Sequence, residues 1–132
     1  MSGEKNIRKL IKEMNPVLNV GEYVFTTVSD INSVSRSITI FEFKEEEGTT
    51  IVLEKSKANE LNLQYQFIAL WITLKIHSSL EAVGLTAAFS SELAKHNISC
   101  NIVSGYYHDH IFVAIKDGQK TIKILTEFSN NY

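Results

Sequence analysis

The sequence has few of the residues that mark secreted, membrane-spanning or multidomain proteins. Its 132 residues include one cysteine, Cys100, and one proline, Pro16. Because a single cysteine cannot form an intramolecular disulfide, we expect a reducing, cytoplasmic compartment. The longest apolar run, residues 67–74, is far too short to span a membrane, and the N-terminal residues lack the apolar segment of a signal peptide. We therefore expect no membrane association.

Charge and loop composition exclude two further classes. The formal net charge is −2, which provides no broad basic surface for nucleic acid. No stretch is rich enough in proline, glycine or serine to be a linker between domains. A hydrophobic content of 44% is sufficient to form a core. We expect one compact domain that covers residues 1–132.

Apolar periodicity predicts helices and strands in the order α-βββ-α-β-α-β-β-α. The strand at residues 67–77 carries apolar residues on both faces, which indicates a central strand covered by helices. Asn62 and Asn97 follow two of the helices, where a residue tolerant of the left-handed conformation is favoured. The predicted helices cover residues 6–14, 55–61, 83–95 and 119–129, and the predicted strands cover residues 22–30, 38–44, 50–53, 67–77, 98–104 and 111–116.

The second half of the chain has the order β-α-β-β-α, which is typical of a split βαβ, or ferredoxin-like, unit. This unit is one strand short at its C-terminus, and the first half could supply the missing strand. We predict an α+β fold with a ferredoxin-like sheet and helices packed on it. Two interleaved halves, residues 1–66 and 67–132, would form it.

The turn between the central strand and the following helix is a candidate binding site. Gly84 allows a close approach of the backbone to a ligand, and free N–H groups at a helix start attract an anion such as an α-carboxylate. Ser78, Ser79 and Thr86 add hydroxyl groups. The alternative is a plain helix cap, with Ser78 or Ser79 capping the turn. The candidate ligand-binding residues of this turn are Ser78, Ser79, Val83, Gly84, Leu85 and Thr86.

A second candidate is the turn His108-Asp109-His110. In a strand, two histidines separated by one residue lie on the same face, as two metal ligands require. His77 ends a neighbouring strand and could join them. The alternatives are histidines hydrogen-bonded within the turn, or contact of His108 and His110 with a ligand or a partner protomer. We assign no metal and no cofactor, and keep the metal site as an alternative.

No catalytic motif is present. The chain has neither a Gly-x-Ser-x-Gly nucleophile elbow nor a glycine-rich phosphate-binding motif. Cys100 lies in an apolar strand pattern, so an inert buried thiol is expected. Asn101 is a polar residue on an otherwise apolar strand, where it either fixes the sheet or faces a ligand. We predict that the protein is not an enzyme.

The helix at residues 83–95 and its flanks resemble the first helix and second strand of ACT domains, the amino-acid-sensing modules of enzymes such as aspartokinase. Gly84 follows the first strand, and Leu93-Ala94 end the helix. In aspartokinase-type units the exit is usually Gly-Ile-Asn, whereas here it is Asn97-Ile98-Ser99. The whole chain is similar to small stand-alone ACT-like proteins in the segments from Pro16 to Phe25, Glu45 to Gly48, His77 to Ala88, Ile98 to Asn101 and Tyr107 to Val113.

The resemblance implies a non-catalytic regulatory domain that binds a small molecule, with an amino acid as the expected ligand. It also implies a homodimer, because ACT units commonly pair their sheet edges and bind amino acids at the seam. Ser99 stands where the family has an asparagine that helps to hold the ligand, so the aspartokinase ligands need not transfer. Ser99, Asn101, His108 and His110 complete the candidate ligand-binding set. The alternatives are a protein-interaction domain that dimerises by sheet edges without a ligand, and a metal-binding protein that uses the His-Asp-His turn.

Overall fold

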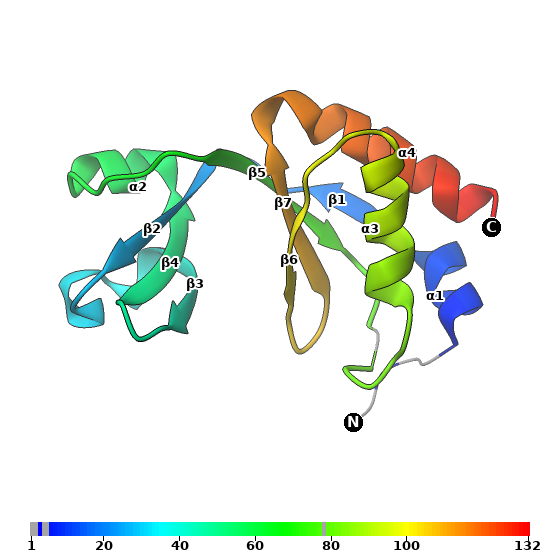
Figure 1. The fold of residues 1–132 in the computed structure, drawn as a ribbon, viewed down its shortest axis with the longest axis horizontal. Helices are drawn as coiled ribbons and strands as arrows, with labels where there is room; N and C mark the ends of the chain where they lie inside the picture. The colour runs from blue at the N-terminus through cyan, green and yellow to red at the C-terminus, as the bar shows by residue number, and fades with distance from the viewer. Residues whose placement is uncertain (1–2, 4–5, 78) are drawn as a thin grey trace. The chain divides into compact units, whose positions relative to one another are not determined.

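The structure is a computed structural model that describes residue 3, residues 6–77 and residues 79–132. Its contacts divide the chain into two compact units, which we call the terminal unit (Met1–Asn19 with Trp71–Tyr132) and the central unit (Val20–Leu70). The helices and strands, labelled in Figure 1, are α1 (Ile7–Glu13), β1 (Pro16–Leu18), β2 (Tyr23–Val28), β3 (Thr39–Lys44), β4 (Thr49–Glu54), α2 (Lys55–Glu60), β5 (Ile68–Leu74), α3 (Leu85–Lys95), β6 (Asn101–Ser104), β7 (Asp109–Ala114) and α4 (Gly118–Asn130).

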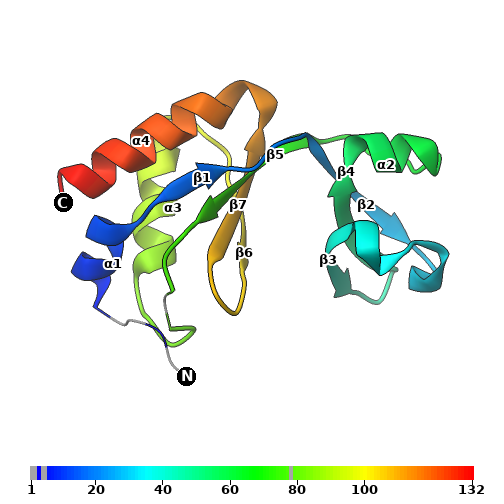
Figure 2. The same cartoon turned by 180° about the vertical axis from the view of Figure 1, so that it is seen from behind.

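The terminal unit contains a sheet in the order β1-β5-β7-β6. β1 pairs antiparallel with the end of β5, with Val17 opposite Thr73, and β6 pairs antiparallel with β7, with Ser104 opposite Asp109. The segment from β5 to α4 is therefore the predicted split βαβ unit, and β1 supplies its missing strand. α1, α3 and α4 pack against one another, as both ribbon views show (Figures 1 and 2). Their buried apolar side chains include Leu10, Ile11, Leu85, Phe89, Leu93, Ile124 and Leu125.

The central unit contains strands in the order β3-β4-β2-β5. β4 pairs antiparallel with both β2 and β3, and the first residues of β5 pair with β2. α2 contributes Ala58 to a core that also contains Val24, Val28, Val34, Ile51 and Leu53. Between β2 and β3, where a ferredoxin-like unit has a helix, the chain forms only two short 3₁₀ turns, Ile31–Ser33 and Arg36–Ile38. The polar composition of residues 31–37 accounts for the lack of a helix with an apolar face.

The structure confirms the predicted α+β class, the four helices and the helix ends at Asn62 and Asn97, which have φ angles of 56° and 59°. It differs at β1, which the sequence does not predict, and at β6, which begins at Asn101 rather than at residue 98. The single domain of residues 1–132, with halves 1–66 and 67–132, stays a prediction. Of the helices in the described residues, none is both long and apolar enough to cross a membrane.

Candidate functional site

The turn before α3 is held by hydrogen bonds of Ser79 within the turn rather than by a helix cap. The Ser79 hydroxyl accepts a hydrogen bond from the Glu81 N–H at 3.1 Å, and the Ala82 N–H donates to the Ser79 carbonyl at 2.9 Å. Ser79 therefore stabilises a tight turn and does not cap α3, which begins at Leu85 and not at residue 83. Ser78, the other predicted cap, lies outside the described residues.

Gly84 occupies the N-cap position of α3, and no side chain caps the helix there. Its φ angle of 99° lies in the left-handed region, which explains why a glycine stands at this position. The first N–H groups of a helix have no partner within the helix. At α3 these groups belong to Leu85, Thr86 and Ala87, and Gly84 has no side chain to accept from them. The next N–H, that of Ala88, donates to the Gly84 carbonyl at 2.9 Å.

A pocket of about 110 Å³ lies beside this turn. Asp109, at the start of β7, is 5% exposed, and it lies opposite Ser104 across the β6–β7 hairpin. These two residues bring a carboxylate and a hydroxyl to the wall that faces the turn. We call this site the turn pocket; it is lined by Ser79, Leu80, Ala82, Leu85, Thr86, Ser104 and Asp109.

The turn pocket brings together only some of the predicted site residues. Ser79, Leu85 and Thr86 line it, whereas Val83 is 86% exposed and is not part of the wall. Ser99 and Asn101 are exposed and follow the other end of α3, an 11-residue helix about 16 Å long. Asn101 is therefore not the buried asparagine that the apolar strand pattern suggests. Neither residue lines the turn pocket.

Two lining residues, Ser104 and Asp109, are not among the predicted ligand-binding residues. In the sequence, Asp109 stands out only as the middle residue of the His108-Asp109-His110 turn. The signal that could have found it is the hairpin register, because a strand ending at Ser104 and one beginning at Asp109 place these two residues side by side. A single sequence leaves that register open.

His110 belongs to a separate polar network on the sheet of the terminal unit. The Trp71 indole N–H donates to His110 Nδ1 at 3.1 Å, and the Thr73 hydroxyl is also 3.1 Å from Nδ1. The Asn19 amide donates to the Thr73 hydroxyl at 3.0 Å. Burial lowers the pKa of His110, the neighbouring His108 lowers it further, and Asp109 acts in the opposite direction. His110 is thus a structural histidine in this network.

The described residues do not form a metal centre. They contain no group of three or more histidine, cysteine, aspartate or glutamate residues that could hold an ion. His108 Nδ1 is buried without a hydrogen-bond partner in the described part of the chain. The ring of His77 packs against Tyr106 and Tyr107, with centroids 6.3 and 5.8 Å away.

Cys100 has the properties of an inert thiol. It is half-buried, and burial raises the pKa of its thiol to about 11. Because the thiolate is the reactive form, a raised pKa leaves Cys100 almost wholly protonated near neutral pH. Cys100 is therefore a poor candidate for a nucleophile.

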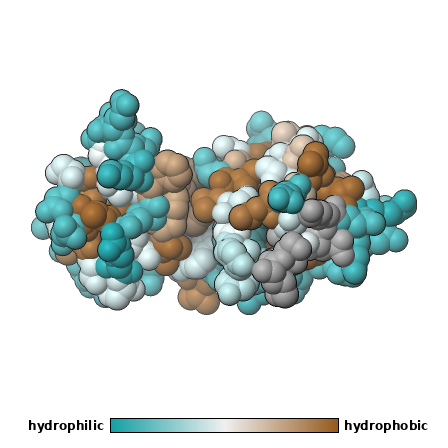
Figure 3. Space-filling model, turned by 90° about the horizontal axis from the view of Figure 1, so that it is seen from below, coloured by the Kyte–Doolittle hydropathy of each residue, from teal (hydrophilic) through white to brown (hydrophobic). Residues whose placement is uncertain are grey.

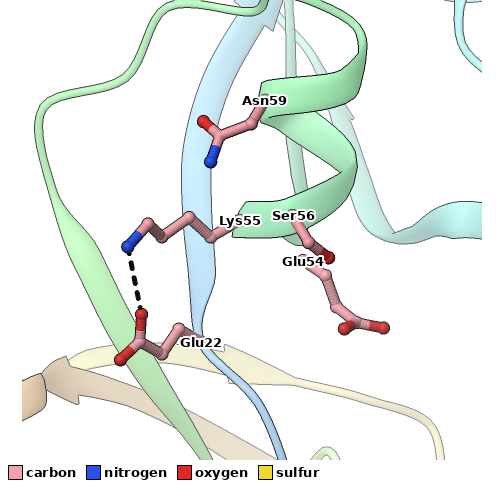
Figure 4. Close-up of a pocket in the computed structure, with 5 residues that line it drawn as sticks. All are labelled: Glu22, Glu54, Lys55, Ser56 and Asn59. Atoms are coloured by element: carbon pink, nitrogen blue, oxygen red, sulfur yellow. Dashed lines mark hydrogen bonds and ion pairs between the residues drawn. The ribbon is translucent and has the colours of Figure 1, made fainter.

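Described residues of the central unit also line hollows, and two of them differ in size and lining. One, of about 250 Å³, is lined by Glu22, Glu54, Lys55, Ser56 and Asn59. Figure 4 shows Glu22 and Lys55 pointing toward each other, while Glu54 points away. The distance from Lys55 Nζ to Glu22 Oε1 is 3.4 Å. Both charges are partly exposed, and such pairs interact weakly.

The other hollow is a larger groove of about 660 Å³, formed by β2, β4 and residues 62–67. None of its described lining residues is charged. Neither hollow contains a buried charged side chain, and in this respect the turn pocket differs from both. Apolar and polar residues are also mixed on the surface of the molecule seen from below, without a clear segregation of the two (Figure 3).

Comparison with known proteins places the fold. Two ACT-domain profiles match the chain, one over residues 2–70 and the other over residues 66–127. No curated protein sequence matches it. A crystal structure of a protein of unknown function from Vibrio cholerae, described as a possible transport protein, is 46% identical, with a TM-score of 0.84 over 95% of this chain and 97% of that chain.

Two aspartate kinase structures share the fold at much lower identity. The ligand-free regulatory subunit from Thermus thermophilus is 5% identical, with a TM-score of 0.59 over 85% of this chain and 95% of that chain. The enzyme from Clostridium acetobutylicum, described as allosteric, is 14% identical, with a TM-score of 0.63 over 89% of this chain and 34% of that chain. With one ACT profile matching just over half of its length and a second matching most of the remainder, the chain belongs to the ACT domain family.

Proposed function

We propose that the protein is a non-catalytic regulatory domain that binds an amino acid in the turn pocket. ACT domains are regulatory, non-catalytic modules that generally bind small molecules such as amino acids and often dimerise. The observation that carries the proposal for this chain is the uncapped start of α3 beside a polar pocket. The ligand, the regulated partner, a homodimer and the cytoplasmic location remain predictions.

The start of α3 suits the carboxylate of an amino acid. The free N–H groups and the positive end of the helix dipole both favour an anion at this position. Thr86 lies in the first turn of α3 and lines the pocket, so its hydroxyl can add a hydrogen bond. Ser79 is held in place by its bond to the Glu81 N–H, and it presents the opposite wall. Together these groups support a carboxylate site of defined geometry.

Thermal melting with each of the twenty amino acids and with several divalent metals tests the proposal. A ligand at a hundred times its Kd stabilises the folded state by roughly 2.7 kcal/mol, which raises the Tm of a protein of this size by several degrees. We expect a dose-dependent rise with at least one amino acid. Thr86→Ala should reduce this rise, and Thr126→Ala, an exposed threonine on α4, should leave it unchanged.

The other outcomes contradict the proposal in different ways. A rise with a metal alone would favour the histidine turn. No rise with any compound would favour the protein-interaction alternative, in which exposed strand edges pair in a dimer; β3 and β6 end the order of paired strands. An equal rise in wild type and Thr86→Ala would move the amino-acid site away from the turn pocket.

A further inference from the structure

We infer that His110 is a proton-sensitive latch on the two connections of the terminal unit. As a neutral ring it fixes Asn19 and Trp71, the residues through which the chain leaves and re-enters this unit, and as an imidazolium it releases them. The chain passes between the two units twice, between residues 19 and 20 and between residues 70 and 71. The latch acts on these connections and is independent of the turn pocket.

The terminal-unit ends of the two connections lie opposite each other, because Asn19 and Trp71 extend the β1–β5 ladder by one step. Leu18 pairs with Ile72, and the Asn19 N–H donates to the Trp71 carbonyl at 2.9 Å. The side-chain amide of Asn19 donates to the same carbonyl at 3.2 Å. The two connecting residues are thus bound directly to each other.

His110 holds both of these residues from the neighbouring strand β7. Its Nδ1 accepts a hydrogen bond from the Trp71 indole N–H at 3.1 Å, and the Thr73 hydroxyl is also 3.1 Å from this nitrogen. The Thr73 hydroxyl in turn accepts from the Asn19 amide at 3.0 Å. One ring nitrogen therefore lies at the centre of the bonds that join Asn19, Thr73 and Trp71.

A proton on Nδ1 reverses the role of this nitrogen. An indole nitrogen can only donate, and a protonated imidazole donates from both of its nitrogens. The imidazolium therefore cannot accept the bond from Trp71, and two N–H groups would point at each other in a part-buried site. The Thr73 hydroxyl can still accept from the imidazolium, so the loss falls on Trp71, one of the two connecting residues.

The surroundings of His110 keep the latch closed at neutral pH. Burial lowers the pKa of His110 and His108 lowers it further, whereas Asp109 raises it. These two neighbours on β7 are the titratable groups that act on His110 in the described part of the chain. Its contacts from β5 are an indole and a hydroxyl, and the residue opposite it on β6 is Val103, none of which titrates in this range. The latch therefore opens only below the ordinary histidine pKa of 6.5.

A pH titration of the ¹⁵N-labelled full chain, followed by NMR from about pH 8 to about pH 4.5, tests the inference. Trp71 is the one tryptophan of the sequence, so its indole N–H gives a single signal of this kind. We expect the signals of the His110 ring, the Trp71 indole and the Asn19 amide to change with one shared midpoint below pH 6.5. Titration of the His110 ring without a change in the other two signals would overturn the latch.

Hydrogen exchange of single backbone amides distinguishes release from a local change of chemical shift. When the latch opens, the Asn19 N–H should exchange about threefold to tenfold faster, after correction for the intrinsic effect of pH, because this ratio corresponds to the loss of one hydrogen bond. The Lys75 N–H donates to the Asn15 carbonyl at 2.9 Å, beyond the other end of the β1–β5 pair, and should keep its protection. Equal acceleration at both amides would mean a general opening of the sheet and would contradict the latch.

Two variants separate the missing acceptor from the other effects of acid. His110→Asn keeps an acceptor oxygen near the position of Nδ1 and cannot be protonated, so its Asn19 N–H should stay protected throughout the pH range. His110→Leu has no acceptor, so its Asn19 N–H should exchange about threefold to tenfold faster than in wild type already at about pH 7.5. If His110→Leu does not fold, the comparison of wild type with His110→Asn still decides the question. Wild-type protection of Asn19 in His110→Leu, or a wild-type pH response in His110→Asn, would overturn the inference.

Discussion

His110 shows how one side chain can be fixed by its neighbours. The Trp71 indole nitrogen can only donate, so His110 Nδ1 must accept, which places the proton of the neutral ring on Nε2. Nε2 faces Gly105, where an added Cβ would lie only 3.4 Å away. Protonation of Nδ1 would remove the hydrogen bond from Trp71.

The lowered pKa of His110 predicts a loss of stability in acid. The unfolded chain has the ordinary histidine pKa of 6.5, and the folded value lies below it because of burial and of His108, with Asp109 opposing. Between these values the unfolded state binds more protons, so the free energy of unfolding is greatest above pH 6.5 and falls as the pH drops through the folded pKa. Urea unfolding at a series of pH values measures this dependence.

Two variants separate His110 from the other histidines. His110→Gln cannot take up the proton, so the loss of stability between pH 7 and pH 5.5 should shrink. His96→Gln, at the exposed C-terminal end of α3, should retain the wild-type loss. An unchanged pH dependence in His110→Gln would contradict the assignment.

At the residue scale, the sequence predicts side-chain chemistry better than it predicts neighbours. Serine and threonine hydroxyls at the turn follow from residue type and position, whereas the hydrogen bonds of His110 with Trp71 and Thr73 do not. Asp109 is the counterexample, since its meaning depends on pairing with Ser104 across a hairpin. Ser99 is the reverse case: its sequence context suggests a ligand contact, yet α3 separates it from the turn pocket.

The junction between the turn and α3 is the element on which the candidate site depends. Gly84 has a φ angle of 99°, and an added Cβ would have its nearest neighbours, atoms of Ile7, at 3.9 Å. Space is therefore available, and backbone conformation alone restricts this position to glycine. A change in the angle at which α3 leaves the turn would displace Leu85 and Thr86 together.

Gly84→Ala should destabilise the protein by about 1 kcal/mol, because the strain of a left-handed alanine exceeds the entropy that the substitution removes from the unfolded chain. Gly84→Asn should be better tolerated, since asparagine adopts this conformation more readily. Urea unfolding midpoints of the two variants and of wild type measure the difference. Equal stability of Gly84→Ala and wild type would show that the turn relaxes to an ordinary conformation.

Among the elements, periodic segments were predictable, and the three-residue strand β1 was not. The helix at residues 119–129 agrees with α4 within one residue at each end, because its apolar residues repeat at helical spacing. β1 contains only three residues, Pro16–Leu18, which is too few for a period to be recognised. It exists because Val17 and Leu18 pair with the end of β5, a contact between segments more than fifty residues apart.

At the scale of the whole molecule, both units have a similar strand order, and the two units differ in their helices. Each unit has four paired strands that include part of β5. One ACT profile, over residues 2–70, includes the central unit, and the other, over residues 66–127, includes most of the C-terminal part of the terminal unit. In the terminal unit, the helix α3 lies between β5 and β6. In the central unit, two 3₁₀ turns lie between β2 and β3 in its place. In the described part of the chain, the terminal unit has an uncapped helix start, that of α3, beside the buried Asp109.

The sequence predicted the fold class and the non-catalytic character of the family, but it could not predict the boundary between the units. α1 and β1 lie with the C-terminal part of the chain because β1 pairs with β5 and α1 packs with α3 and α4. Hydrophobic periodicity describes each segment by itself, so it contains no information on such long-range pairing.

The most direct test of the amino-acid site is a two-dimensional NMR titration of the ¹⁵N-labelled protein with alanine. A ligand in the turn pocket should shift the amide signals of Leu85 and Thr86 most strongly, together with those of Ser104 and Asp109. The signals of Glu22, Lys55 and Asn59, which line the hollow of the central unit, should stay unchanged. The largest shifts at those three residues, or no shift at any residue, would contradict the account.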